Sequence, residues 1–116
     1  LTQACLPLLE KSADAAVVFA LDAQAPGTRA YWGGYGLAQA GQVALVDMLQ
    51  AELGPNSPVR VSGLSPGPMR TSLRANAFVA EHDHAAVDPA RIAQRCVELL
   101  SPAGAAHRGL VWSPTA

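Results

Sequence analysis

An unbroken apolar run at residues 15–21 limits the possible folds of this chain more than any other segment. The run has the length of a strand, but it lacks the alternation of apolar and polar residues seen in a strand with one face in water. It therefore predicts a strand in a sheet that is covered on both faces, as parallel sheets are. The edge of such a strand must be covered too, because an unpaired apolar edge pairs readily with other chains.

The rest of the chain alternates between helical and strand-like patterns. Further strands are expected at 59–64 and 108–113, and helices at 1–11, 34–53, 72–79 and from Pro89 onwards. Asp88 before Pro89 is typical of a capped helix start, since proline fits the first helical position. Strands that alternate with helices predict β-α-β crossovers. The fold class is therefore α/β, with three parallel strands and flanking helices.

Composition bounds the classes of function. The chain has 116 residues, half of them apolar, which suffices for one domain that buries about two-thirds of its unfolded surface. A formal charge of −1 without blocks of like charge argues against nucleic acid and anionic lipid as partners. The apolar opening at 1–9 lacks a basic region and is too short to span a membrane. Cys5 and Cys96 are isolated, so we expect reduced thiols and a cytoplasmic protein.

Two histidines in a polar segment, His82 and His84, raise the question of a metal site. They lie beside Glu81 and Asp83, but the spacing supplies no further well-placed ligand. Our interpretation is a solvated loop, and we predict no metal site.

Two motifs give the chain its resemblance to a known family. The run Tyr31-Trp-Gly-Gly-Tyr35 opens the long helix, and the turn Pro66-Gly-Pro-Met-Arg-Thr71 follows the strand at 59–64. In this order they resemble the C-terminal half of a short-chain dehydrogenase/reductase, and within that family a bacterial subgroup of uncharacterised oxidoreductases. The resemblance covers 1–116 as a single partial domain. It implies the C-terminal part of a Rossmann-like doubly wound parallel sheet, with an N-terminal half expected upstream of Leu1.

The resemblance implies catalytic roles for three residues. Tyr35 matches the tyrosine that exchanges a proton with the substrate hydroxyl, and Gln39 stands where the family has a lysine. Without that cation, the pKa of the Tyr35 phenol should stay near its reference value of about 10. Asp22 stands where the family has a serine, and an ionised Asp22 would raise the pKa of Tyr35 further. The sequence predicts a degenerate active site, unless Tyr35 is only a packing aromatic.

The same resemblance implies NAD or NADP as the cofactor. The residues matched to it are Pro66, Gly67, Thr71 and Gln39. The turn at 66–67 would pack against the nicotinamide, Thr71 would bond its carboxamide, and Gln39 could bond a ribose hydroxyl. The Gly-rich turn that receives the pyrophosphate does not occur in this chain, which alone is expected to be inactive. Alternatively, the turn only ends a strand, and Arg70 and Arg74 are solvated surface.

The function implied is NAD(P)-dependent redox chemistry on a small carbonyl or secondary alcohol. The alternative is a catalytically silent nucleotide-binding or oligomeric scaffold of the same fold, because the lysine and the serine are both replaced. In the family, the helices that match 1–11 and 34–53 pack against a second subunit. Both segments are more apolar than the sheet requires, so we expect a homo-oligomer.

Overall fold

Three parallel strands form the sheet, in the order β1-β2-β3. The structure, a computed structural model, describes residues 1–24, 30–80 and 86–114. β1 (Ala15–Ala20) pairs with β2 (Val59–Leu64) along its whole length, whereas β3 (Val111–Trp112) pairs only with the end of β2. The predicted parallel sheet and α/β class are confirmed.

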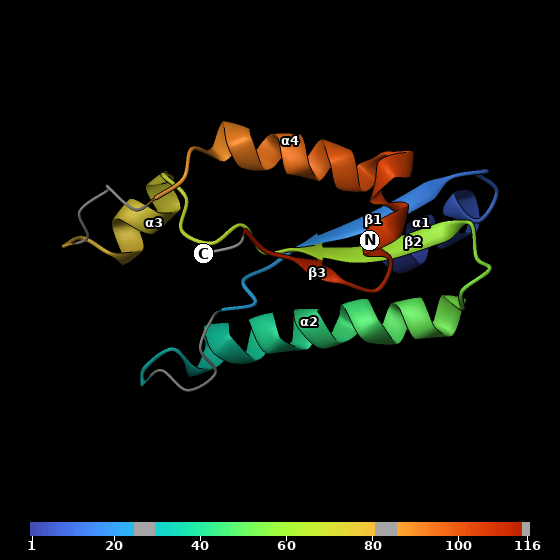
Figure 1. Cartoon of the computed structure of the whole chain (residues 1–116). Coiled ribbons are helices and arrows are strands. Elements are labelled where there is room, and N and C mark those ends of the chain that lie inside the picture. The colour runs from blue at the N-terminus through green and yellow to red at the C-terminus, as the bar shows by residue number, and fades with distance from the viewer. Residues whose placement is uncertain (25–29, 81–85, 115–116) are drawn as a thin grey trace.

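Helices cover both faces of the sheet (Figure 1). α2 (Gly33–Leu53) lies along one face and α4 (Pro89–Leu100) along the other. The buried cluster on the α2 side is Leu21, Val46 and Val61, and the cluster on the α4 side is Leu64, Ile92 and Leu99. β2 is buried throughout, as expected for an apolar strand between two helical layers. Within the described ranges, no helix is both long and apolar enough to cross a membrane.

β1 lies at the edge of the sheet as far as the described residues go. Its only strand partner there is β2, its central side chains are half-buried, and Ala20 is exposed. α1 (Thr2–Leu9) packs beside it. One side of β1 therefore lacks the cover that its apolar sequence indicates.

Capping residues and glycines set the helix ends. The Asp88 side chain accepts a hydrogen bond from the Ala90 N–H at 2.9 Å, so the predicted start of α4 is confirmed. Gly54 ends α2 with φ +74°, a backbone conformation that favours glycine. Thr71 caps α3 (Ser72–Ala77) by accepting from the Arg74 N–H at 3.2 Å. The helix predicted at 72–79 ends early because the backbone of Phe78 leaves the helical region.

The third strand is shorter than predicted. A 3₁₀ helix, η2 (Pro102–His107), follows α4, and Gly109 then turns the chain with φ +70°. These two features use most of the backbone before Val111. Only two residues of the segment 108–113 are left to pair as β3.

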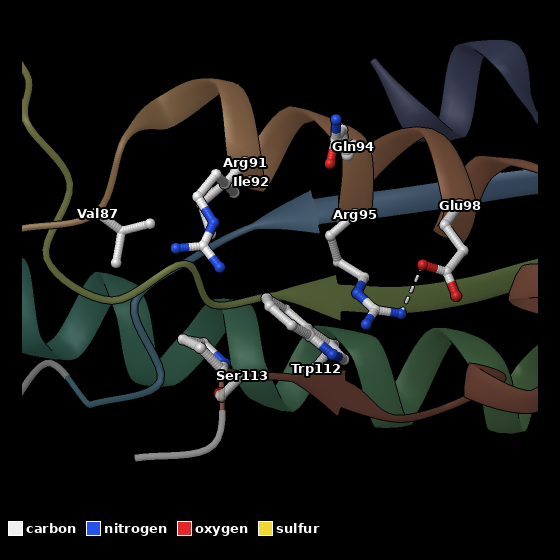
Figure 2. Close-up of a pocket in the computed structure, with 9 residues that line it drawn as sticks. Val87, Arg91, Ile92, Gln94, Arg95, Glu98, Trp112 and Ser113 are labelled. Carbon is white, nitrogen blue, oxygen red and sulfur yellow. Dashed lines mark ion pairs between the residues drawn. The ribbon is translucent and has the colours of Figure 1, made fainter.

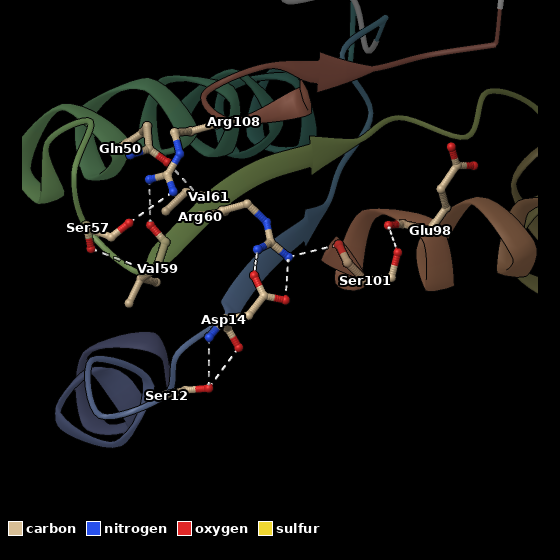
Figure 3. Close-up of polar contacts among 10 residues, drawn as sticks. All are labelled: Ser12, Asp14, Gln50, Ser57, Val59, Arg60, Val61, Glu98, Ser101 and Arg108. Carbon is tan, nitrogen blue, oxygen red and sulfur yellow. Dashed lines mark hydrogen bonds and ion pairs between the residues drawn. The ribbon is translucent and has the colours of Figure 1, made fainter. Parts of the chain in front are cut away.

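A buried arginine joins β2 to the end of α4 (Figure 3). Arg60 is 4% exposed, forms an ion pair with Asp14, and donates to the Ser101 carbonyl at 2.9 Å. Nearby, Arg108 donates to the carbonyls of Val59 and Ser57, each at 3.0 Å. These bonds satisfy the two terminal nitrogens of Arg60, whereas its buried Nε has no hydrogen-bond partner among the described residues. They hold the end of the sheet opposite to the candidate site.

Candidate functional site

The three residues predicted to be catalytic lie together where β1 ends and α2 begins. Asp22 follows β1, Tyr35 is in the first turn of α2, and Gln39 is one turn further along. The Tyr35 hydroxyl donates to Asp22 Oδ2 at 3.3 Å, and the Asp22 N–H donates to Gln39 Oε1 at 2.8 Å. The helical spacing of Tyr35 and Gln39 lets both side chains face the same loop.

Asp22 accepts hydrogen bonds on both carboxylate oxygens. Oδ1 takes the N–H of Gln24 at 3.1 Å, and Oδ2 takes the Tyr35 hydroxyl. This pattern is an acceptor arrangement, unlike that of the serine hydroxyl that the family places here. In this geometry Asp22 accepts the hydrogen bond of Tyr35 and offers no donor to a substrate carbonyl.

The environment of Tyr35 keeps its phenol protonated. Partial burial raises the pKa of Tyr35 above its ordinary value, and the Asp22 charge and hydrogen bond raise it further. The sequence predicted the effect of Asp22 but missed the larger contribution of burial. The side chain is still 44% exposed, so the hydroxyl stays accessible to small molecules.

Gln39 has one free donor at this site. Its side-chain carbonyl is used by Asp22, while its amide nitrogen donates no hydrogen bond to any described residue. A neutral donor beside Tyr35 fits a ribose hydroxyl, although it cannot supply the charge of a lysine. Gln39 therefore has a donor suited to a nicotinamide cofactor, but it does not supply a positive charge.

The turn after β2 lies close to the same loop. Ser65, which is fully buried, accepts from the Ala23 N–H at 3.0 Å and so joins the ends of β1 and β2. Gly67 has φ +70°, and the sharp turn that it makes with Pro66 leads away from Ser65. Sequence reasoning missed Ser65, although its position between a buried strand and the Pro-Gly turn was a usable signal.

Thr71 lies apart from the three catalytic candidates. Its hydroxyl caps α3, and it lines a small recess of about 280 Å³ together with Arg70 and Arg74. Arg70 pairs with Asp88 at 3.3 Å, and this exposed ion pair favours the surface interpretation for that residue. Neither Pro66 nor Gly67 lines this recess.

An aromatic cluster borders Tyr35. The Trp32 ring meets the Tyr35 ring edge-on at 5.6 Å and stacks on Phe78 at 5.3 Å. The Arg74 guanidinium lies 4.5 Å from the centre of the Phe78 ring. The cluster ties α3 to the start of α2, a role that the sequence did not reveal for Phe78.

No metal centre is evident among the described residues, where no group of three or more His, Cys, Asp or Glu side chains could hold an ion. His82 and His84 lie outside the described residues.

Comparisons with known proteins identify the fold and the family. No protein family model matches the chain. The uncharacterised oxidoreductase YciK of Escherichia coli K12 is 36% identical over 92 residues, which are 79% of this chain and 36% of YciK. A short-chain dehydrogenase from Pseudomonas syringae superposes with a TM-score of 0.87 at 32% identity, over 97% of this chain and 46% of that one. A short-chain dehydrogenase from Escherichia coli CFT073, complexed with NADPH, gives 0.86 at 31% identity, with the same coverage.

The chain thus spans less than half the length of the relatives that it matches. Within that span, sequence and structure agree in pointing to one family. The predicted resemblance is confirmed, and the chain is related in sequence and in fold to the short-chain dehydrogenases/reductases.

Proposed function

We propose that this chain is part of an NAD(P)-dependent oxidoreductase that acts on a small carbonyl or secondary alcohol. The observation that carries the proposal is the accessible Tyr35 hydroxyl, held by Asp22 beyond the carboxyl end of β1. Ligands of open α/β sheets bind at this edge. A relative of similar fold is complexed with NADPH, which supports a nicotinamide cofactor here. The pyrophosphate would be held by residues outside this chain, which spans less than half of its relatives.

Carbonyl reduction is the direction that starts from the protonated phenol. Tyr35 is protonated at neutral pH, and its hydroxyl would turn from Asp22 to donate to a carbonyl oxygen. The nicotinamide, when bound, supplies hydride to the carbonyl carbon. Tyr35 gives its proton to the oxygen, and water restores that proton through the exposed side of the ring. Asp22 disfavours the phenolate that reduction leaves behind and that alcohol oxidation would start from, so it opposes the proton transfer in both directions.

Three positions would hold the nicotinamide end of the cofactor. The free amide nitrogen of Gln39 would donate to a ribose hydroxyl, since its carbonyl is already used by Asp22. The Thr71 hydroxyl accepts from the Arg74 N–H, so its own proton remains for a carboxamide oxygen. The turn at Pro66 and Gly67 would pack against the ring.

The test is NAD(P)H oxidation by the full-length protein with a panel of small ketones and aldehydes. Tyr35→Phe should abolish turnover, whereas Tyr31→Phe, at a fully exposed side chain, should not change it. The double change Asp22→Ser with Gln39→Lys should increase turnover, because it restores a donor and a cation. Turnover unaffected by Tyr35→Phe would refute the role of Tyr35. Cofactor binding without turnover would indicate the alternative, a silent scaffold, which the similarity to oxidoreductases does not favour.

We further propose a cytoplasmic homo-oligomer. Cys5 and Cys96 are both free thiols, which suits a reducing compartment. The helices α1 and α2 expose Leu8, Leu37 and Met48, which are 71%, 74% and 59% accessible, and a second subunit would cover such residues. Sedimentation of the full-length protein tests this proposal, and a monomer at micromolar concentration would contradict it.

A further inference from the structure

A second cleft lies on the face of the sheet opposite to α2. It has a volume of about 610 Å³ and runs between α4 and the residues around the end of β3. Figure 2 shows it between the ribbon of α4 and the residues Trp112 and Ser113. A volume of several hundred Å³ is typical of sites for small molecules. None of the proposed catalytic or cofactor-binding residues lines it.

Two arginines one turn apart on α4 enter this cleft, but only one of them is neutralised. Arg95 pairs with Glu98 at 2.7 Å, and its guanidinium lies 4.7 Å from the centre of the Trp112 ring. Arg91 has no acceptor for its guanidinium among the described residues. The cleft therefore carries a net positive charge from Arg91.

A serine lines the same cleft as the unpaired arginine. In Figure 2 the guanidinium of Arg91 reaches from α4 toward Ser113, with Val87 at one side. The Ser113 hydroxyl also makes no hydrogen bond to a described residue. Arg91 and Ser113 thus line one cleft, whose other walls combine the apolar side chains of Val87, Ile92 and Trp112 with the polar side chains of Gln94, Arg95 and Glu98.

We propose that this cleft binds an organic carboxylate with an apolar body. The planar guanidinium of Arg91 matches both oxygens of a carboxylate, and Ser113 can add a third hydrogen bond. The apolar part would pack against Val87 and the free edge of Trp112. The site is independent of Tyr35, which belongs to the helix on the other face of the sheet.

Calorimetric titration of the full-length protein with benzoate, without nicotinamide, tests this assignment. Benzoate should bind saturably, and Arg91→Gln should weaken it about tenfold or more, because a charge-assisted bidentate bond is lost. Arg91→Lys should retain part of the affinity, while Lys11→Gln, which removes the same charge outside the cleft, should change nothing. The exposed position of Arg91 makes these variants compatible with folding, which thermal melts would verify.

Four results would overturn the proposal. The first is the absence of saturable benzoate binding, and the second is equal binding of benzoate by the wild type and by Arg91→Gln. The third is that benzyl alcohol, a neutral isostere, binds as tightly as benzoate. The fourth is that phenyl phosphate binds more tightly than benzoate. Tyr35→Phe should bind benzoate as the wild type does, and a loss there would assign benzoate to the redox site instead. Failure of the proposed redox function would leave these binding results unchanged.

Discussion

The backbone N–H of Asp22 donates a hydrogen bond to the side-chain carbonyl of Gln39 across 2.8 Å. Gln39 therefore has a structural role of its own. It fixes the loop after β1 against the first turns of α2, and it holds Asp22 where its carboxylate meets Tyr35. Changes at position 39 should thus affect the stability and the geometry of the site together.

Gln39→Leu should destabilise the protein by about 1–3 kcal/mol, because the part-buried N–H of Asp22 would lose its acceptor. Denaturant unfolding followed by circular dichroism measures this loss. Gln42→Leu is the matched control, since Gln42 lies in the same helix and makes no side-chain hydrogen bond to a described residue. Equal losses in the two variants would show that the bond to Asp22 contributes little.

The pKa of Tyr35 gives a second prediction. In a Tyr31→Phe background Tyr35 is the sole tyrosine, so tyrosinate absorbance reports its ionisation alone. The midpoint should lie above the ordinary value of about 10 and fall in Asp22→Asn, which removes the neighbouring charge. It should stay raised in that variant because burial is the larger cause. A midpoint that does not respond to Asp22→Asn would contradict the Tyr35–Asp22 contact.

The raised pKa of Tyr35 determines whether the stability of the protein rises or falls with pH. The folded state holds the Tyr35 proton more tightly than the unfolded chain does. Tyr35 therefore contributes stability that is fully present below the unfolded pKa of about 10 and lost as pH rises through the folded pKa. Unfolding free energies measured across this range should fall less steeply in Tyr35→Phe.

The sequence correctly predicted those parts of the fold that a pattern of neighbouring residues indicates. An apolar run specifies β1, and Asp88 with Pro89 specifies the start of α4. β3 was predicted too long, because no periodic pattern announced the 3₁₀ helix η2 or the positive φ of Gly109. A turn of that kind depends on how the end of α4 packs, which local propensity does not encode.

The residues of the candidate site divide in the same way, into those that a local pattern predicts and those that only tertiary structure brings together. Tyr35 and Gln39 are related by helical spacing, and Asp22 follows an evident strand, so their proximity could be predicted. The Ser65 contact with Ala23 joins residues 42 positions apart, and Phe78 reaches Trp32 only through the placement of α3. Such contacts arise from tertiary structure alone.

The stack of Trp32 on Phe78 gives a fourth prediction. Phe78→Ala should destabilise the protein by about 0.5–1.5 kcal/mol beyond the loss of buried area, since it removes an aromatic pair. In a Trp112→Phe background, where Trp32 is the sole tryptophan, its emission should shift to the red as the ring gains contact with water. Val79→Ala, at an adjacent and 89% exposed side chain, should leave the emission unchanged. An unshifted spectrum in Phe78→Ala would exclude the stack in solution.

The ion pair of Arg60 with Asp14 gives the last prediction. Replacing the more exposed partner, Asp14, should cost more stability than replacing the buried partner, Arg60. Asp14→Asn should cost about 2–3 kcal/mol, because it leaves the charge of Arg60 buried with only neutral acceptors as partners. Arg60→Met should cost less, since the remaining Asp14 carboxylate is 42% exposed and can be hydrated. Glu98→Gln, which breaks an exposed pair with Arg95, should cost under about 1 kcal/mol. Denaturant unfolding of the three variants tests this ranking, and a loss in Asp14→Asn no larger than in Glu98→Gln would show that the buried charge is solvated in another way.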